Sequence, residues 1–264
     1  TLCNLLMPVA SDVEESPTEA DAADEGLPIN EVFYSLQGEG TLAGVPSVFV
    51  RTSGCNLRCW FCDSYHTSWE PTGAWRDVDS IMEEVHSHEQ ADHVVLTGGE
   101  PLIHEESVEL LERLATDGYH TTVETNGTIY RDAPINLASI SPKLASSTPT
   151  PGRDPKGEGE WEQKHEQNRI DMDALSRIVD DYETQLKFVV TDESDLPEIT
   201  DLVAQVRAAT TTTVADDDVL LMPEGMTREQ LDGTRSEVAQ LAMENGYRYT
   251  PRLHVDLWND APGT

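Results

Sequence analysis

Short apolar runs alternate with longer stretches of helical periodicity from residue 31 onward. Runs of roughly four to eight apolar and β-branched residues are typical of buried strands, and apolar residues spaced three and four apart are typical of amphipathic helices. The pattern predicts seven strands, at residues 32–35, 47–52, 93–97, 121–124, 137–140, 185–190 and 219–222. It predicts five helices, at residues 78–88, 105–116, 173–182, 196–208 and 228–244. This alternation predicts an α/β fold, with Asp77 and Thr227 as N-caps of the first and last helices.

Every predicted strand from residue 47 onward ends in a turn rich in glycine, proline or polar residues. The turns are Ser53-Gly-Cys55, Gly98-Gly-Glu-Pro101, Thr125-Asn-Gly127, Ser141-Pro-Lys143, Thr191-Asp-Glu193 and Pro223-Glu-Gly225. Such residues form turns at any strand end, which could account for one or two of these motifs. Six in succession, after parallel strands, predict a functional site along one rim of the sheet. About six strands fit a partial (β/α)6 barrel better than a closed eightfold one.

The chain ends and one internal segment depart from this pattern. Residues 1–28 contain seven acidic residues, no basic one and many Pro, Ser and Ala, a composition that predicts a disordered tail. Residues 29–264 are predicted to form a single domain. Within it, residues 145–170 are rich in Pro, Gly, Glu and Lys, which predicts an exposed loop excursion or lid. Residues 250–258 alternate in character and predict a final strand.

The chain is strongly acidic, with 50 Asp and Glu against 17 Lys and Arg, a net charge of −33 and only four lysines. This charge repels nucleic acid and anionic membranes, so neither is expected as a partner. No apolar run reaches the roughly 18 residues of a membrane span, and the first residues lack the basic flank of a secretory signal, so a cytoplasmic protein is expected. Acidic, lysine-poor surfaces resemble those of proteins from salt-accumulating cells, which predicts salt-dependent folding.

Three cysteines stand close together after the second predicted strand. Cys55, Cys59 and Cys62 have a C-x3-C-x2-C spacing, close enough to hold one inorganic centre. A closed structural site uses four protein ligands, whereas three thiolates on a [4Fe–4S] cluster leave one iron open for a substrate or cofactor. The alternatives are a zinc site completed by His66 and a redox disulfide between Cys59 and Cys62. Cys3, in the acidic tail, is interpreted as incidental.

The cysteine spacing resembles the signature of the radical S-adenosylmethionine (SAM) enzymes, in which the open iron binds the amino and carboxyl groups of SAM. Gly98-Gly-Glu-Pro101 strengthens the resemblance, because a turn of this sequence meets the SAM amino group in those enzymes. The resemblance implies a [4Fe–4S] cluster and SAM as cofactors, with SAM cleaved to methionine and a 5′-deoxyadenosyl radical. The residues implied to bind SAM are Gly99, Glu100, Glu124, Asn126, Ser141 and Lys143.

The segment Phe-Tyr-Ser-Leu-Gln-Gly-Glu-Gly, at residues 33–40, narrows this resemblance. Together with Arg51 and the Cys62-Asp-Ser64 end of the cysteine loop, it resembles the 7-carboxy-7-deazaguanine synthase family, over residues 31–222. The implied reaction is the ring contraction of 6-carboxy-5,6,7,8-tetrahydropterin to 7-carboxy-7-deazaguanine with loss of ammonia, in archaeosine or queuosine biosynthesis. The residues implied to bind the pterin are Gln37, Gly38, Glu39, Arg51 and Thr97.

The chemistry of these residues suits such a substrate. The Glu39 carboxylate can bind the adjacent N–H donors of an amino-pyrimidinone edge, and the rigid fork of Arg51 suits the substrate carboxylate. Without the resemblance, Glu39 would be interpreted as part of a Gly-rich hairpin and Arg51 as a surface ion pair. Ser64 stands where many family members carry a threonine that binds Mg²⁺, and its hydroxyl supplies the same hard oxygen, so Mg²⁺ is expected as a further cofactor. His254 is interpreted first as a core or dimer-contact histidine, with a contribution to the active site as the alternative.

The resemblance also implies partners. A homodimer and an electron donor such as a flavodoxin or ferredoxin are expected alongside the small-molecule pterin. The residues are also compatible with two other functions. A SAM-dependent activase would place a glycyl radical on a partner protein and would need an open groove for a peptide. A non-enzymatic iron–sulfur or zinc interaction module would have no use for the SAM-type turns.

Overall fold

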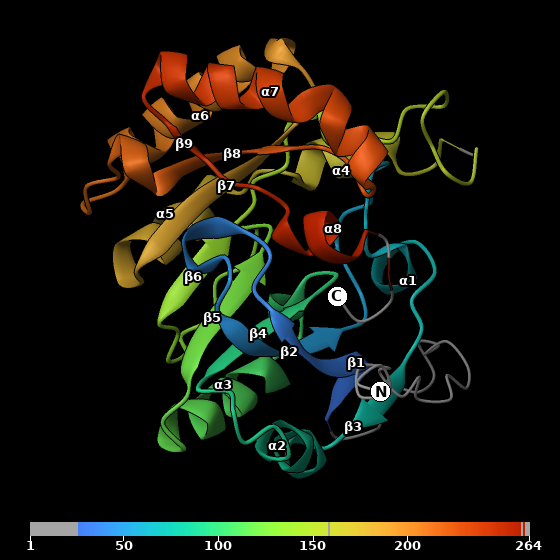
Figure 1. Cartoon of the computed structure of the whole chain (residues 1–264), viewed down its shortest axis with the longest axis vertical. Helices are drawn as coiled ribbons and strands as arrows, with labels where there is room; N and C mark the ends of the chain where they lie inside the picture. The colour runs from blue at the N-terminus through green and yellow to red at the C-terminus, as the bar shows by residue number, and fades with distance from the viewer. Residues whose placement is uncertain (1–25, 158, 260, 262–264) are drawn as a thin grey trace, which may run out of the picture.

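A mixed nine-stranded sheet runs through the described part of the chain (Figure 1). The computed structural model describes residues 26–157, 159–259 and 261. The strands are β1 (Leu27–Leu36), β2 (Pro46–Thr52), β3 (Ala74–Arg76), β4 (His93–Gly98), β5 (His120–Thr125), β6 (Leu137–Ile140), β7 (Thr184–Val190), β8 (Val219–Pro223) and β9 (Arg248–Tyr249). Their order in the sheet is β3-β1-β2-β4-β5-β6-β7-β8-β9. β1 is antiparallel to β2 and β3, and every pair from β2–β4 to β8–β9 is parallel.

Helices cover the outside of this sheet, and Figure 1 shows α2 and α3 toward one end and α6 and α7 toward the other. The helices are α1 (Tyr65–Ser68), α2 (Val78–His86), α3 (Glu106–Thr116), α4 (Glu162–Asn168), α5 (Met172–Asp181), α6 (Leu196–Ala209), α7 (Arg228–Asn245) and α8 (Leu253–Trp258). One buried apolar cluster lies between α2, α3 and the first strands, and a second between α5, α6, α7 and the last strands. None of the described helices is long and apolar enough to cross a membrane.

The predicted α/β architecture is confirmed, and its central part is the predicted partial barrel. β2, β4, β5, β6, β7 and β8 run parallel in sequence order, and within the described residues the sheet ends at β3 and β9 without closing. The predicted helix caps are also confirmed. The Asp77 side chain accepts a hydrogen bond from the Ser80 amide, and Thr227 forms a capping box with Gln230, each of which stabilises a helix by about 1 kcal/mol.

Two predictions fail at the edges of the domain, and a third falls on residues outside the described part of the chain. Residues 250–258 do not form a strand, because Pro251 has no amide hydrogen with which to continue the ladder that ends at β9; residues 250–252 are irregular and Leu253–Trp258 form helix α8. The boundary predicted at residue 28 falls inside β1, where Leu27 is already fully buried. Residues 1–25 of the predicted disordered tail, with Cys3, lie outside the described residues.

The segment at 145–170 is not a purely exposed excursion. It contains a short 3-10 helix, Ala145–Ser147, and α4, and both Ser147 and His165 are fully buried. Residues 151–153 and 155–157 between them are exposed, as predicted. Composition indicated the exposed tip, but it could not show that the flanks of the segment pack against a distant loop.

Candidate functional site

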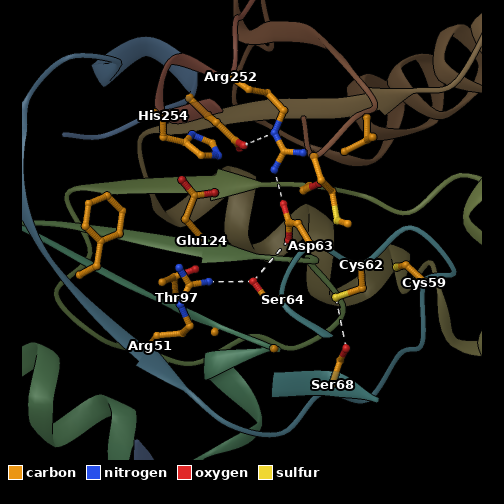
Figure 2. Close-up of a pocket in the computed structure, with 18 of the residues that line it drawn as sticks. Arg51, Cys59, Cys62, Asp63, Ser64, Ser68, Thr97, Glu124, Arg252 and His254 are labelled. Atoms are coloured by element: carbon orange, nitrogen blue, oxygen red, sulfur yellow. Dashed lines mark hydrogen bonds and ion pairs between the residues drawn. The ribbon is translucent and has the colours of Figure 1, made fainter. Parts of the chain in front are cut away.

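A cavity of about 540 Å³ opens at the carboxyl ends of the parallel strands. The turns that follow β2, β4, β5, β6 and β8 all contribute to its wall, which confirms the predicted rim. The predicted site residues that line it are Gln37, Gly38, Glu39, Arg51, Cys55, Cys59, Cys62, Ser64, Thr97, Gly99, Glu124, Asn126, Ser141 and Lys143. Figure 2 shows Cys59 and Cys62 at one side of this cavity, and Arg51, Glu124 and His254 toward the other.

The cysteine loop connects β2 to α1 and forms one wall of the cavity. Cys55, Cys59 and Cys62 carry free thiols, so the Cys59–Cys62 disulfide considered above is not formed. Burial raises the pKa of all three thiols, for Cys59 to about 12. Within the described residues, no three His, Cys, Asp or Glu side chains gather around a single metal ion, and this holds for the three cysteines with or without His66.

The glycine turn after β4 packs directly on the cysteine loop. The Gly99 amide donates to the Thr52 carbonyl at 3.2 Å, and the Glu100 amide donates to the Gly54 carbonyl at 2.9 Å. A Cβ at Gly99 would lie 2.1 Å from the Gly54 oxygen and 2.8 Å from the Cβ of Cys55. Only glycine allows this approach, so the two loops form one unit.

Glu100 is the one predicted site residue that does not line the cavity. Its side chain is fully buried and turns toward the loop after β5. The carboxylate accepts hydrogen bonds from the Asn126 amide at 2.6 Å, from the Thr125 hydroxyl at 2.9 Å and from the Leu102 amide at 3.1 Å. Burial outweighs these bonds and raises the pKa of Glu100 to about 7. Glu100 therefore positions the Thr125–Asn126 turn.

A buried charged network forms the opposite wall. Lys187 Nζ lies 2.6 Å from Glu39 Oε2 and 2.8 Å from Glu124 Oε2. Arg252 Nε lies 3.0 Å from Glu39 Oε1, and the same guanidinium pairs with Asp63 (Figure 2). Burial raises the pKa of Glu39, but Lys187 and Arg252 outweigh it and hold that pKa well below its usual range. The network therefore keeps Glu39 ionised.

Arg51 links the first strands to the cysteine loop. Its Nη1 donates to Ser64 Oγ at 2.7 Å (Figure 2), and its Nε lies 2.8 Å from Glu31 Oε1. The guanidinium carbon stands 5.4 Å from the centre of the Phe33 ring. Arg51 is thus a half-buried cation held from several sides, and not the surface ion pair of the alternative interpretation.

The Gln37-Gly-Glu39 segment meets the C-terminal residues across the cavity. Gln37 Nε2 donates to Glu124 Oε1 at 3.1 Å, and the Leu253 amide donates to the Gly38 carbonyl at 2.8 Å. A Cβ at Gly38 would lie 2.0 Å from His254 Nδ1. His254 lines the cavity, as its alternative interpretation as an active-site contributor requires.

The remaining predicted SAM-binding residues lie at the end of β5 and on the loops after β5 and β6. Lys143 Nζ donates to Ser141 Oγ at 2.6 Å. Asn126 donates from Nδ2 to Asn56 Oδ1 at 2.9 Å, which ties its loop to the cysteine loop. Glu124 faces Lys187 and also accepts from the Ser139 hydroxyl at 2.9 Å. These loops present a cation, hydroxyls and an amide to the cavity beside the cysteines.

Sequence reasoning missed two cations of the network, Lys187 and Arg252. A lysine in the middle of the apolar strand β7 was a usable signal, because a buried ammonium requires a partner. Arg252 gave a weaker signal, since nothing in its neighbourhood along the chain indicated that it pairs with Glu39, 213 residues away. Arg252 also pairs with Asp63, at the end of the cysteine loop, and so ties this loop to the C-terminal residues.

Comparison with known proteins agrees with this geometry. Residues 49–144 match the Radical SAM superfamily model. The 7-carboxy-7-deazaguanine synthase of Halobacterium salinarum is 68% identical over 260 residues, which cover 98% of this chain and all of the relative. The enzyme of the same name from Rhodopirellula baltica is 41% identical over 95% of this chain and 93% of its own length. The crystal structure of QueE from Escherichia coli superposes with a TM-score of 0.62 at 26% identity, covering 88% of this chain and 96% of that one. The chain belongs to the 7-carboxy-7-deazaguanine synthase family of the radical SAM superfamily.

Proposed function

We propose that this chain is a 7-carboxy-7-deazaguanine synthase, which contracts the ring of 6-carboxy-5,6,7,8-tetrahydropterin with loss of ammonia. The observation that carries the proposal is one cavity with three free thiols on one wall and a network of paired charges on the other. The names of relatives that align over nearly the whole chain agree with it. When bound, the [4Fe–4S] cluster and SAM supply one-electron cleavage and hydrogen abstraction, and the protein supplies positioning and exclusion of water.

The donor set of the cysteine loop fits a cluster with one open iron. Cys55, Cys59 and Cys62 all reach the cavity, and the close approach of Gly99 brings the SAM-type turn against them. Because burial raises the pKa of each thiol, the loop holds neutral thiols before a cluster assembles. Assembly of the cluster must therefore release their protons, which makes cluster uptake more favourable as pH rises.

The SAM carboxylate is best matched by Lys143, with Ser141 and Asn126 available for its polar groups. Lys143 and the Gly99 backbone line the same cavity as the three thiols. Glu100 contributes indirectly, because its buried carboxylate holds the Asn126 backbone in place.

The pterin is proposed to bind against Gln37, Gly38, Glu39, Arg51 and Thr97, which line the cavity together. Each carboxylate oxygen of Glu39 already accepts a hydrogen bond, one from Lys187 and the other from Arg252. The N–H groups of the pterin edge would therefore bind to the same two oxygens as these cations. The Arg51 fork suits the substrate carboxylate. Lys187 and Arg252 keep Glu39 ionised and hence able to accept a hydrogen bond.

Mg²⁺ is proposed to bind the Ser64 hydroxyl oxygen, with waters and substrate oxygens as its other ligands. Ser64 is largely buried, and its oxygen now accepts a hydrogen bond from Arg51. A cation at Ser64 would replace that contact and leave the Arg51 guanidinium to the substrate carboxylate. The metal and the arginine would then hold the same end of the pterin.

We further propose that the protein works in the cytoplasm as a homodimer, reduced by a flavodoxin or ferredoxin, without binding nucleic acid or membranes. The net charge of −33 supports the last two statements, because like charges repel. The homodimer and the electron donor rest on the family resemblance.

The direct test is anaerobic reconstitution with iron and sulfide in high salt, followed by SAM, a reductant and 6-carboxy-5,6,7,8-tetrahydropterin. A product with the ultraviolet spectrum of a deazapurine is expected, and a Cys59→Ala variant should form none. If no deazapurine formed while a glycyl radical appeared on an added partner protein, the activase function would replace this one.

A further inference from the structure

Residues 37–41 carry two of the side chains proposed to bind the pterin, Gln37 and Glu39. The segment follows β1 and continues into a short 3-10 helix, Gly40–Leu42, in which no residue is buried. Thr41, at the centre of this helix, is exposed. Because burial of apolar side chains cannot fix such a helix, the position of the segment depends on its polar contacts.

Gln185 supplies one of these contacts from β7. Its side chain is 2% exposed and stands in a strand that is otherwise mainly apolar. Its Oε1 accepts a hydrogen bond from the Thr41 amide at 2.8 Å. A Cβ at Gly40 would lie 2.2 Å from Gln185 Nε2, so only glycine allows the chain to pass this closely over the glutamine. The backbone of the segment therefore packs directly on Gln185.

The other end of the Gln185 amide leads back to the same segment. Its Nε2 donates to Ser139 Oγ at 2.8 Å, and the Ser139 hydroxyl donates to Glu124 Oε2 at 2.9 Å. The second oxygen of Glu124 accepts from Gln37 Nε2 at 3.1 Å. These hydrogen bonds leave the segment at Thr41 and return to it at Gln37. Since a backbone amide only donates, the oxygen of Gln185 must face Thr41, which fixes the direction of the chain of hydrogen bonds.

Lys187 extends the contact between β7 and the segment. It stands two residues after Gln185, and side chains two apart lie on the same face of a strand. Its Nζ lies 2.6 Å from Glu39 Oε2. Strand β7 thus contacts the segment at Glu39 and again at Thr41, through two neighbouring polar side chains.

We propose that Gln185 is a positioning residue for the pterin, which fixes residues 37–41 across the cavity so that Gln37 and Glu39 are already arranged to receive the substrate. The inference deepens the proposed function and rests on it, because it assumes that Gln37 and Glu39 bind the pterin. A segment that is ordered before binding loses less conformational entropy when the substrate arrives. A glutamine with a purely structural role would affect stability and leave the affinity for the pterin unchanged.

The test compares the wild type with Gln185→Leu, which keeps a side chain of similar size and removes both hydrogen bonds. In the reconstituted enzyme, the KM for the pterin should rise roughly tenfold with a smaller change in kcat, because the segment must then be ordered on binding. Gln163→Leu, at an exposed position of α4, is the matched control and should keep the wild-type KM. A wild-type KM in Gln185→Leu would overturn the proposal.

A second measurement needs neither cluster nor substrate. In the cluster-free protein, the Thr41 amide should exchange its hydrogen roughly tenfold faster in Gln185→Leu, while the amides of β4 should exchange as in the wild type. Gln185→Glu still offers an oxygen to the Thr41 amide and should keep its exchange near that of the wild type. Equal exchange at Thr41 in wild type and Gln185→Leu, or faster exchange at all amides alike, would overturn the positioning role.

The two measurements separate this inference from the proposed function. If the wild type formed no deazapurine, the proposed function would fail, and the exchange at Thr41 would still decide whether Gln185 holds the segment. If the wild type formed deazapurine and Gln185→Leu matched it in both KM and exchange, the inference alone would fail.

Discussion

At the scale of single residues, the ammonium of Lys187 compensates the negative charge of two carboxylates in the cavity wall. Its side chain is 3% exposed and lies between the carboxylates of Glu39 and Glu124. Burial lowers the pKa of this lysine, but the two carboxylates outweigh burial and hold the pKa above its usual range. A buried ion pair contributes little net stability, yet the loss of one partner leaves an uncompensated charge.

The substitution Lys187→Met is therefore expected to lower the free energy of unfolding by about 3–5 kcal/mol. Chemical denaturation of the cluster-free protein in high salt measures the change. Lys164→Met is the matched control: Lys164 is exposed on α4 and its ammonium lies over the Trp161 ring, so its loss should change the stability by no more than about 1 kcal/mol. Equal losses in the two variants would contradict the assigned charge network.

Arg51→Lys tests the role of the guanidinium fork in activity. Lysine keeps the positive charge but offers the substrate carboxylate a single point contact instead of two parallel hydrogen bonds. We expect the KM for the pterin to rise roughly tenfold, equivalent to about 1.4 kcal/mol, with a smaller change in kcat. Steady-state kinetics measure both constants, and an unaltered KM would remove Arg51 from the substrate site.

His93 provides a pH-dependent contribution to stability, away from the cavity. It is buried, its Nδ1 lies 2.7 Å from the Ser47 hydroxyl, and burial and then the charge of His120 lower its pKa from 6.5 to about 4. The unfolded chain therefore binds a proton near pH 6.5, while the folded chain does so only near pH 4. The free energy of unfolding should fall as pH decreases through this window, by up to about 3 kcal/mol from this residue.

His93→Gln should remove that part of the pH dependence. Unfolding curves of wild type and variant between pH 7 and pH 4 provide the measurement, and the difference between them isolates His93. His165 contributes a dependence of the same sign in both proteins, since burial also lowers its pKa to about 4. If the free energy of unfolding depended on pH equally in the two proteins, His93 would not be the source of this pH dependence.

At the scale of elements, the contact between two loops determines where the three thiols lie in the site. The cysteine loop after β2 and the glycine turn after β4 touch through Gly54 and Gly99, where no side chain fits. Adjacent parallel strands bring these loops together, because β2 pairs with β4 along residues 48–52 and 94–98. The sheet register therefore places the three thiols next to the SAM-type turn.

Gly99→Ala is expected to separate these loops and to prevent cluster uptake, because its Cβ would lie 2.1 Å from the Gly54 carbonyl oxygen. Iron and sulfide bound per chain after reconstitution measure the effect, and circular dichroism shows whether the fold persists. Gly152→Ala is the matched control, since the space around Gly152 is open. Wild-type iron content in Gly99→Ala would contradict the close packing of the loops.

The sequence allowed the rim of the site to be predicted, but not its charged wall. Each parallel strand ends at the same edge, so motifs such as Cys55 to Cys62 and Gly98 to Pro101 could be placed from local pattern alone. Lys187 and Arg252 could not, because their roles depend on Glu39, which lies 148 and 213 residues away along the chain. Helix α8 was mistaken for a strand because short segments with alternating apolar residues fit either structure.

At the scale of the whole molecule, the surface charge sets the conditions under which the site can exist. A net charge of −33 on 264 residues favours expansion of the chain, and salt at about 1 M shortens the screening length to about 3 Å. The paired charges of the cavity wall are buried and are screened much less. Salt should therefore act mainly on the surface and leave the network intact.

The midpoint of thermal unfolding should rise steadily as KCl increases from about 0.1 M to about 2 M, because salt screens the repulsion between surface carboxylates. Circular dichroism of the cluster-free protein measures it, with sucrose at equal osmolality as a neutral control that should raise the midpoint less. Full folding at low ionic strength, with no dependence on salt, would contradict this account of the acidic surface.

The central claim is that three thiolates hold a [4Fe–4S] cluster whose fourth iron is open to SAM. The most direct measurement is the iron and sulfide content of the anaerobically reconstituted protein, with the electron paramagnetic resonance spectrum of the reduced cluster before and after addition of SAM. We expect about four irons and four sulfides per chain and a spectrum that changes when SAM binds the open iron. A single zinc per chain, or a reduced cluster whose spectrum is the same with and without SAM, would contradict the proposed open iron.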